Sequence, residues 1–156
     1  MSATVFKGSV RSMEGLRVEG KSRGLRVMFD EPEELGGTNE GMNPIEMLLN
    51  ALGACQIITA KMYAPKFGVE LRSMWVDVEG DLNIDGFKGV PDVKPGLQEI
   101  RCNMHFVTDS AEEQVIKLAE AVENTCPVGD TLASSMNVLV KRHIRRSADL
   151  GEPYHF

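Results

Sequence analysis

The stretch from Asn43 to Cys55, NPIEMLLNALGAC, decides how the rest of the chain folds. It predicts the start of a helix, because Asn43 can cap the helix, Pro44 suits its first position and Glu46 lies where a capping box has its carboxylate. Apolar residues then follow on nearly every side: Ile45, Met47, Leu48, Leu49, Ala51, Leu52, Ala54, Ile57 and Ile58. A helix that is apolar nearly all round is buried. We therefore expect the domain to pack around a helix from Asn43 to about Lys66.

Expected elements on both sides of this helix complete the fold. Before it, alternating residues predict three strands in a meander over residues 3–29, followed by a polar, Gly-rich loop at 30–42. After it, strands are expected at 69–84, 97–107 and 137–144, with a helix capped by Ser110 and a short helix that Pro127 begins. Strands outnumber helices without regular alternation, which indicates an α+β fold with antiparallel sheet. We expect one domain over residues 1–156.

Composition excludes several classes of function. A net charge of -6 argues against nucleic acid, because phosphate binding needs a basic face. No apolar run approaches the ~20 residues of a membrane span, and the N-terminus has no signal-peptide core. We therefore expect a cytoplasmic protein with reduced thiols and without a membrane partner. Three cysteines without CxxC spacing do not predict a metal site.

The three cysteines have different surroundings. Cys102 shares the apolar face of its expected strand and is predicted to be a core residue. Cys126 precedes a Pro-initiated helix, whose free N–H groups favour a thiolate. Cys55 lies mid-helix and gains nothing from a helix end, so it needs a nearby cation. One arginine at ~4 Å would supply on the order of 4 kcal/mol. The meander contains four candidate arginines, and the strand periodicity does not favour any one of them: Arg11, Arg17, Arg23 and Arg26.

Two motifs make the chain resemble the OsmC/Ohr family, the osmotically inducible and organic-hydroperoxide-resistance proteins. They are ELGGTNEGMNPIEMLLNALGAC, from Glu34 to Cys55, and TCPV, from Thr125 to Val128. The resemblance implies an intertwined homodimer with two long central helices and active sites between the subunits. It also implies a peroxidase of the oxidative stress response that needs no cofactor. Such an enzyme reduces small hydrophobic peroxides with a Cys pair, and a lipoylated protein or another dithiol re-reduces it.

The resemblance assigns roles to individual residues. Cys55 matches the thiolate that attacks the peroxide, Cys126 the resolving thiol and Arg17 the arginine that holds the thiolate. The peroxidases of the family have a Glu where this chain has Ile45. Glu46 follows one residue later, about 100° around the helix, and is at most a supporting residue. We therefore expect an unanchored Arg17 and a slow peroxidase that Ile45→Glu would accelerate.

Two other functions remain open at this point. The first is a Cys-dependent hydrolase or acyl carrier, which needs a base near Cys55; His105 is the mid-chain candidate. The second is a dimeric binding protein whose cleft holds an apolar ligand, with the thiols incidental. Peroxide consumption with a dithiol favours the peroxidase. Ester turnover without redox change favours the hydrolase, and ligand retention without both thiols favours the binding protein.

Overall fold

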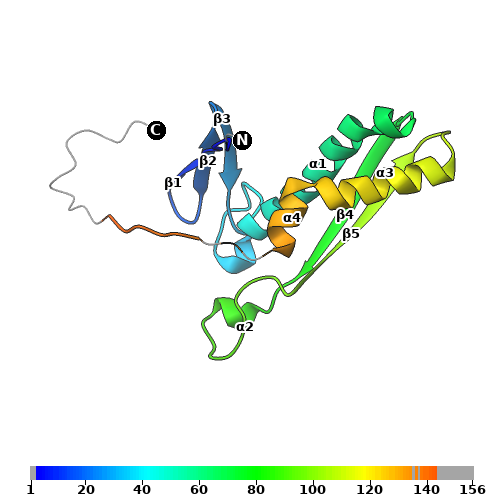
Figure 1. Cartoon of the computed structure of the whole chain (residues 1–156). Coiled ribbons are helices and arrows are strands. Elements are labelled where there is room, and N and C mark those ends of the chain that lie inside the picture. Colours follow the sequence, from blue (N-terminus) through cyan, green and yellow to red (C-terminus); the bar gives the residue numbers. More distant parts are fainter. Residues whose placement is uncertain (1–2, 135, 137, 144–156) are drawn as a thin grey trace. The chain divides into compact units, whose positions relative to one another are not determined.

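The chain folds as two units in the computed structural model, which describes residues 3–134, 136 and 138–143. The meander unit comprises the residues up to Pro44 together with those from Met136 on, and the helical unit comprises Ile45–Ser135. Each unit contains one antiparallel sheet, and the helices α1 to α4 belong to the second (Figure 1). This arrangement confirms the α+β class with antiparallel sheet.

The meander unit has the three strands that the alternating pattern predicts. They are β1 (Ser9–Ser12), β2 (Val18–Ser22) and β3 (Leu25–Phe29), paired antiparallel in the order β1-β2-β3. Arg23 and Gly24 connect β2 to β3 with φ angles of 52° and 85°. Positive φ at both positions is what a tight two-residue hairpin requires. After β3 the chain forms a short 3-10 helix, η1 (Glu33–Leu35), within the loop that leads to α1.

The helical unit is built on the predicted long helix. This helix is α1 (Pro44–Tyr63), and a 3-10 turn, η2 (Ala64–Phe67), continues it to Gly68. A hairpin of β4 (Ser73–Asp81) and β5 (Glu99–Val107) follows, and then α3 (Glu112–Thr125) and α4 (Pro127–Ala133). The core between α1, η2, α3 and the hairpin is formed by Ala60, Ala64, Val69, Leu118 and Val122, with Met74, Met104 and Phe106 packed against it.

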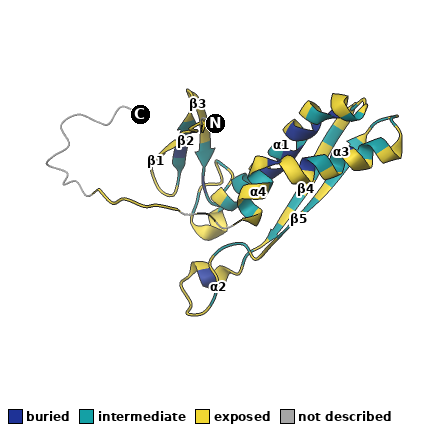
Figure 2. Ribbon diagram, in the orientation of Figure 1, coloured by how far each residue is buried: buried dark blue, intermediate teal, exposed yellow. Residues whose placement is uncertain are grey.

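One face of α1 is exposed within the single chain. Ile58 and Met62 keep 59% and 73% of their surface accessible, and Ala51 and Ala54 on the same stripe are also exposed. Figure 2 shows this mixture of exposed and buried positions along α1. The single chain therefore leaves one face of α1 uncovered, because the hairpin and α3 cover only part of the helix.

Three local expectations are wrong. Ile84 does not end a strand but begins the one-turn helix α2 (Ile84–Phe87), because the Asn83 side chain accepts the N–H of Asp85. Ser110 does not cap α3; its hydroxyl instead accepts the N–H of Glu70 at 2.9 Å. Residues 138–143 form no strand, and Val138, Leu139 and Val140 are highly exposed. The remaining ends of that expected strand, 137 and 144, lie outside the described residues.

Candidate active site

Cys55 and Cys126 lie side by side in the helical unit. Cys55 is in the middle of α1, and Cys126 is the residue immediately before α4. The two side chains are close enough for a hydrogen bond. Cys126 is 1% exposed, and its Sγ accepts the N–H of Gly129 at 3.4 Å. The structure thus brings together the two cysteines that the resemblance paired, both as free thiols.

Cys126 differs from its prediction in its ionisation. Burial, then the hydrogen bond with Cys55, raises the pKa of the Cys126 thiol, and the N–H of Gly129 opposes the shift only in part. The expected thiolate at this position is therefore wrong. The reason is that removing a sulfur from water disfavours its charged form more than one long hydrogen bond favours it. The buried surroundings of Cys126 therefore favour the protonated thiol.

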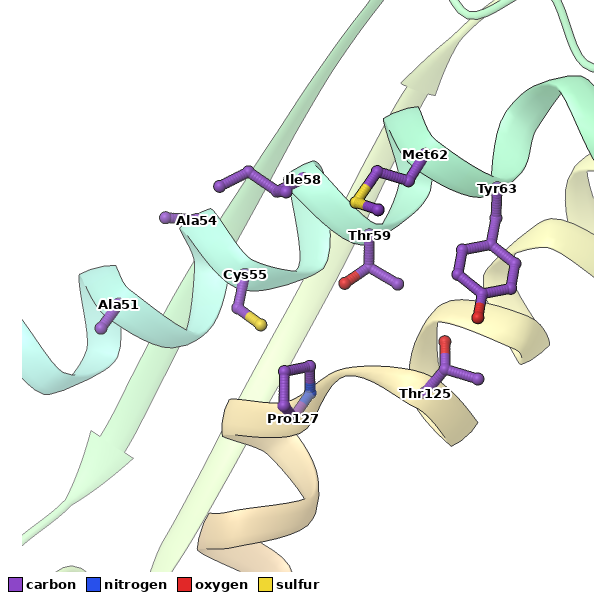
Figure 3. A pocket seen from close by; sticks show the side chains of 9 residues that line it. All are labelled: Ala51, Ala54, Cys55, Ile58, Thr59, Met62, Tyr63, Thr125 and Pro127. Atoms are coloured by element: carbon purple, nitrogen blue, oxygen red, sulfur yellow. The ribbon is translucent and has the colours of Figure 1, made fainter. Parts of the chain in front are cut away.

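A largely apolar pocket of about 440 Å³ lies beside Cys55. Its lining comes from α1 and from the residues around the start of α4: Ala51, Ala54, Cys55, Ile58, Thr59, Met62, Tyr63, Thr125 and Pro127. Figure 3 shows the Cys55 sulfur directed toward Pro127, with the hydroxyl groups of Tyr63 at the end of α1 and Thr125 at the end of α3 facing each other. Such a pocket can place an apolar molecule next to the sulfur.

Arg17 belongs to the meander unit, where it is anchored by carboxylates. It immediately precedes β2, and its side chain is 25% exposed. Its Nη1 donates to Glu40 Oε2 at 2.8 Å, and Nη2 lies 3.5 Å from Glu14 Oε2. The hydrogen bond with Glu40 and its charge raise the pKa of Arg17 above its ordinary value. The expectation of an unanchored Arg17 is therefore wrong.

Sequence reasoning did not identify Glu40 or Asp30, which belong to the Gly-rich loop. Asp30 is 2% exposed and accepts four hydrogen bonds, from the N–H groups of Glu31, Thr38 and Glu40 and from the Thr38 hydroxyl. The hydroxyl contributes most to lowering the pKa of Asp30 to about 2. The available signal was an Asp followed by Thr, Asn and three glycines, which is typical of a loop with side-chain to backbone bonds. Glu46 lies exposed in the first turn of α1, and its supporting role stays a prediction.

Cys102 and His105 lie on opposite faces of β5. Cys102 pairs across the hairpin with Val78, and Val78 faces Gly53 of α1, so Cys102 lies on the predicted apolar face but is only partly buried there. His105 stacks on Trp75, and its Nε2 lies 2.9 Å from Asp77 Oδ2. Since alternate residues of a strand face opposite sides, His105 is turned away from α1. His105 is therefore not placed to act as a base for Cys55, and the hydrolase hypothesis is left without its candidate base.

The described residues contain neither a metal-binding cluster nor a membrane-spanning helix. No group of three or more His, Cys, Asp or Glu there could hold a metal ion. In the same part of the chain, no helix has the length and apolar character to cross a membrane.

Comparison with known proteins identifies the family. The sequence model described as "OsmC-like protein" matches residues 37–141, which include Cys55 and Cys126. The chain belongs to the OsmC family. This confirms the resemblance, and the match begins within the loop that carries Glu40.

Individual relatives are distant. The uncharacterized protein YmaD of Bacillus subtilis is 27% identical over 80% of this chain and 83% of its own length. A hydroperoxide reductase of Mycoplasma pneumoniae is 26% identical over 61% of this chain and 64% of its own. The crystal structure of an OsmC-like protein from Mycoplasma pneumoniae matches with a TM-score of 0.74 at 22% identity, covering 85% of this chain and 89% of that one. These matches support the OsmC-like fold.

Proposed function

We propose that this OsmC-family protein is a thiol-dependent peroxidase that reduces organic hydroperoxides. The observation that carries the proposal is the placement of Cys55 beside both Cys126 and an apolar pocket. An apolar pocket favours the organic part of a hydroperoxide over hydrogen peroxide. The hydroperoxide reductase relative supports the same chemistry.

The reaction begins with the Cys55 thiolate as nucleophile. It attacks the terminal oxygen of the hydroperoxide, the O–O bond breaks, and the alkoxide leaves and takes a proton to become an alcohol. The sulfur is oxidised to a sulfenic acid and the peroxide is reduced. The neighbouring Cys126 then attacks this sulfur, a disulfide forms and water leaves. An external dithiol, such as a lipoylated protein, opens the disulfide by thiol–disulfide exchange and is itself oxidised.

The protonated state of Cys126 suits the second role. A buried thiol whose pKa is raised reacts slowly with peroxide, because the thiolate is the nucleophile. It remains reduced until a sulfenic acid forms beside it. We therefore assign attack to Cys55 and resolution to Cys126, as the resemblance implies.

Serine variants test these assignments with cumene hydroperoxide and dithiothreitol. We expect Cys55→Ser to abolish consumption, and Cys126→Ser to complete one turnover before it is overoxidised. Cys102→Ser is the matched control, since its sulfur lies on β5 with Val78 opposite, and should keep wild-type rates. Equal loss of activity from all three substitutions would refute the assignment.

A binding function is the second candidate, because the pocket is largely apolar whether or not the thiols react. In that case an apolar ligand would bind equally well to the Cys55→Ser/Cys126→Ser protein. Fluorescence titration of that variant with an apolar probe, alongside peroxide assays of wild type, separates the two functions. Retained probe binding with no peroxide consumption by wild type would favour the binding protein.

We also propose that a second copy of the chain covers the exposed face of α1. The stripe formed by Ala51, Ala54, Ile58 and Met62 borders the pocket, so a partner lying on it would exclude water from the substrate. Ile58→Glu should weaken the dimer, and Ile116→Glu, the same change at a half-exposed isoleucine of α3 that does not line the pocket, should not. Light scattering measures both; a stable wild-type monomer at micromolar concentration would contradict the proposal.

A further inference from the structure

The guanidinium of Arg17 is held in one direction by unequal partners. Glu40 accepts from Nη1 at 2.8 Å, whereas the Glu14 carboxylate is 3.5 Å from Nη2 and its side chain is 92% exposed. Arg17 Nε is 3.4 Å from the Glu14 carbonyl oxygen. Short charge-assisted hydrogen bonds are the strong ones, so Glu40 dominates the orientation. A guanidinium has five N–H groups, so these contacts leave donors for a further anion.

The backbone of Glu40 is fixed by the buried Asp30. Asp30 Oδ2 accepts the Glu40 N–H at 3.1 Å, and it also accepts the N–H and hydroxyl of Thr38 at 3.0 and 2.6 Å. The other oxygen, Oδ1, accepts the Glu31 N–H at 2.9 Å. One carboxylate thus joins the start of the loop to the segment that carries Glu40.

Two glycines restrict the loop to this shape. A Cβ at Gly41 would lie 2.6 Å from the Met28 carbonyl oxygen, and a Cβ at Gly37 would overlap Glu31. The chain can therefore approach itself this closely only with glycine at these positions. Glu40 lies between these two glycines, so its side chain starts from a backbone with little freedom.

We propose that Glu40 is a positioning residue for Arg17 in the peroxidase reaction, and that Asp30 acts through it by fixing the loop. Glu40 would supply the carboxylate that Ile45 cannot. This inference rests on the proposed function and on the role that the resemblance assigns to Arg17, that of the arginine that holds the thiolate. A fixed guanidinium loses less conformational freedom when it binds a thiolate or a peroxide oxygen.

The negative charge of Glu40 makes it possible to distinguish two effects on Arg17, that of its charge and that of its orientation. If Arg17 acted only through its positive charge, removing the negative charge of Glu40 would strengthen its attraction for an anion and accelerate the reaction. If orientation matters more, Glu40→Gln slows the reaction despite that gain. The Glu40 side chain is 56% exposed, so the amide fits without a change of volume or burial.

The test is a double-mutant cycle on the second-order rate of oxidation by cumene hydroperoxide. We expect Glu40→Gln to lower the rate about tenfold in wild type, as for loss of one charge-assisted hydrogen bond. In an Arg17→Met background the same substitution should change the rate by less than about twofold, which a merely structural effect of Glu40 would not produce. Glu14→Gln is the matched control at the weaker partner of Arg17 and should behave as wild type.

The contribution of Asp30 is tested at Thr38. Thr38→Val removes the shortest hydrogen bond of Asp30. It should slow oxidation about threefold, less than Glu40→Gln, because the lost bond acts on Arg17 only indirectly, through the loop that carries Glu40. Thr38→Ser keeps the hydroxyl and should restore the rate. Equal rates for Thr38→Val and wild type would remove Asp30 from the proposal.

The outcomes separate this inference from the proposed function. A Glu40→Gln protein as fast as wild type or faster, with Arg17→Met still slow, overturns the inference and leaves the peroxidase intact. An equal effect of Glu40→Gln with and without Arg17 also overturns it. Absence of thiol-dependent peroxide consumption by wild type would overturn both.

Discussion

The two units of the chain are stabilised in different ways. In the described residues, every buried apolar side chain belongs to the helical unit, with Leu118 and Val122 at 0% exposure. The meander unit instead buries two carboxylates, Glu19 and Asp30. Glu19 is paired with Arg11 and Arg26, and Asp30 accepts four hydrogen bonds from its own loop.

The two units, each taken by itself, therefore offer different chemical surroundings to their functional groups. The helical unit holds two neighbouring thiols beside a largely apolar pocket. The meander unit holds the guanidinium of Arg17 in one direction, because charge and hydrogen bonds fix its orientation. The two units should therefore respond differently to substitution and to pH.

The largest effect on stability is expected in the helical unit. Leu118→Ala leaves a cavity in the core under α3 and should lower the free energy of unfolding by about 2–5 kcal/mol. Because no titrating group is involved, the loss should be similar at pH 7 and pH 4. Urea denaturation at both values checks this, and a loss confined to one pH would break the comparison.

The next effect is on activity and arises in the meander unit. Arg17→Met removes the arginine to which the resemblance assigns the thiolate, and should slow oxidation by about 10- to 150-fold, the equivalent of one or more charged hydrogen bonds. Arg72→Met is the control, since Arg72 is an exposed arginine of the helical unit that is paired with Asp109 of the same unit. Stopped-flow oxidation measures both rates. Similar rates for the two variants would exclude a special role for Arg17.

A smaller, pH-dependent effect is expected at Asp30. Its pKa falls from an ordinary 3.8 to about 2 in the folded chain, so its ionised form stabilises the fold. That contribution is complete above the unfolded pKa and disappears as the pH falls through the folded one. Asp30→Asn should therefore be less stable than wild type at pH 6, and the difference should shrink between about pH 4 and pH 2. A difference that stays constant over this range would contradict the interpretation.

The smallest effect is expected at Ile45. The sequence alone predicted that Ile45→Glu would accelerate a protein whose Arg17 lacked a carboxylate. Since Glu40 already anchors Arg17, we now expect the rate with cumene hydroperoxide to change by less than about twofold. A tenfold gain would show that Glu40 is an inadequate substitute.

The elements and residues that the sequence predicted correctly lie where regular periodicity operates. The apolar pattern after Asn43 gave α1, and Pro127 marked the start of α4 with Cys126 before it. The resemblance added the pairing of Cys55 with Cys126, and the structure places them together. In these places local geometry and residue type determine position.

The features that sequence reasoning missed depend on contacts between distant or irregular segments. Glu40 reaches Arg17 across 23 positions of the chain, and nothing in the periodicity of either segment indicates this. The pKa of Cys126 rises because the thiol is buried beside another, which its helix-start context does not reveal. The apolar alternation at 138–143 predicts a strand, but a strand also needs a hydrogen-bonding neighbour, which a sequence does not show.

The pairing of Cys55 with Cys126 is the central claim and can be measured directly. The reduced protein is treated with one equivalent of cumene hydroperoxide, alkylated and digested, and the peptides are identified by mass spectrometry. The account predicts a disulfide between Cys55 and Cys126, with Cys102 recovered as an alkylated thiol. A disulfide that includes Cys102, or recovery of both Cys55 and Cys126 as unoxidised thiols, would contradict it.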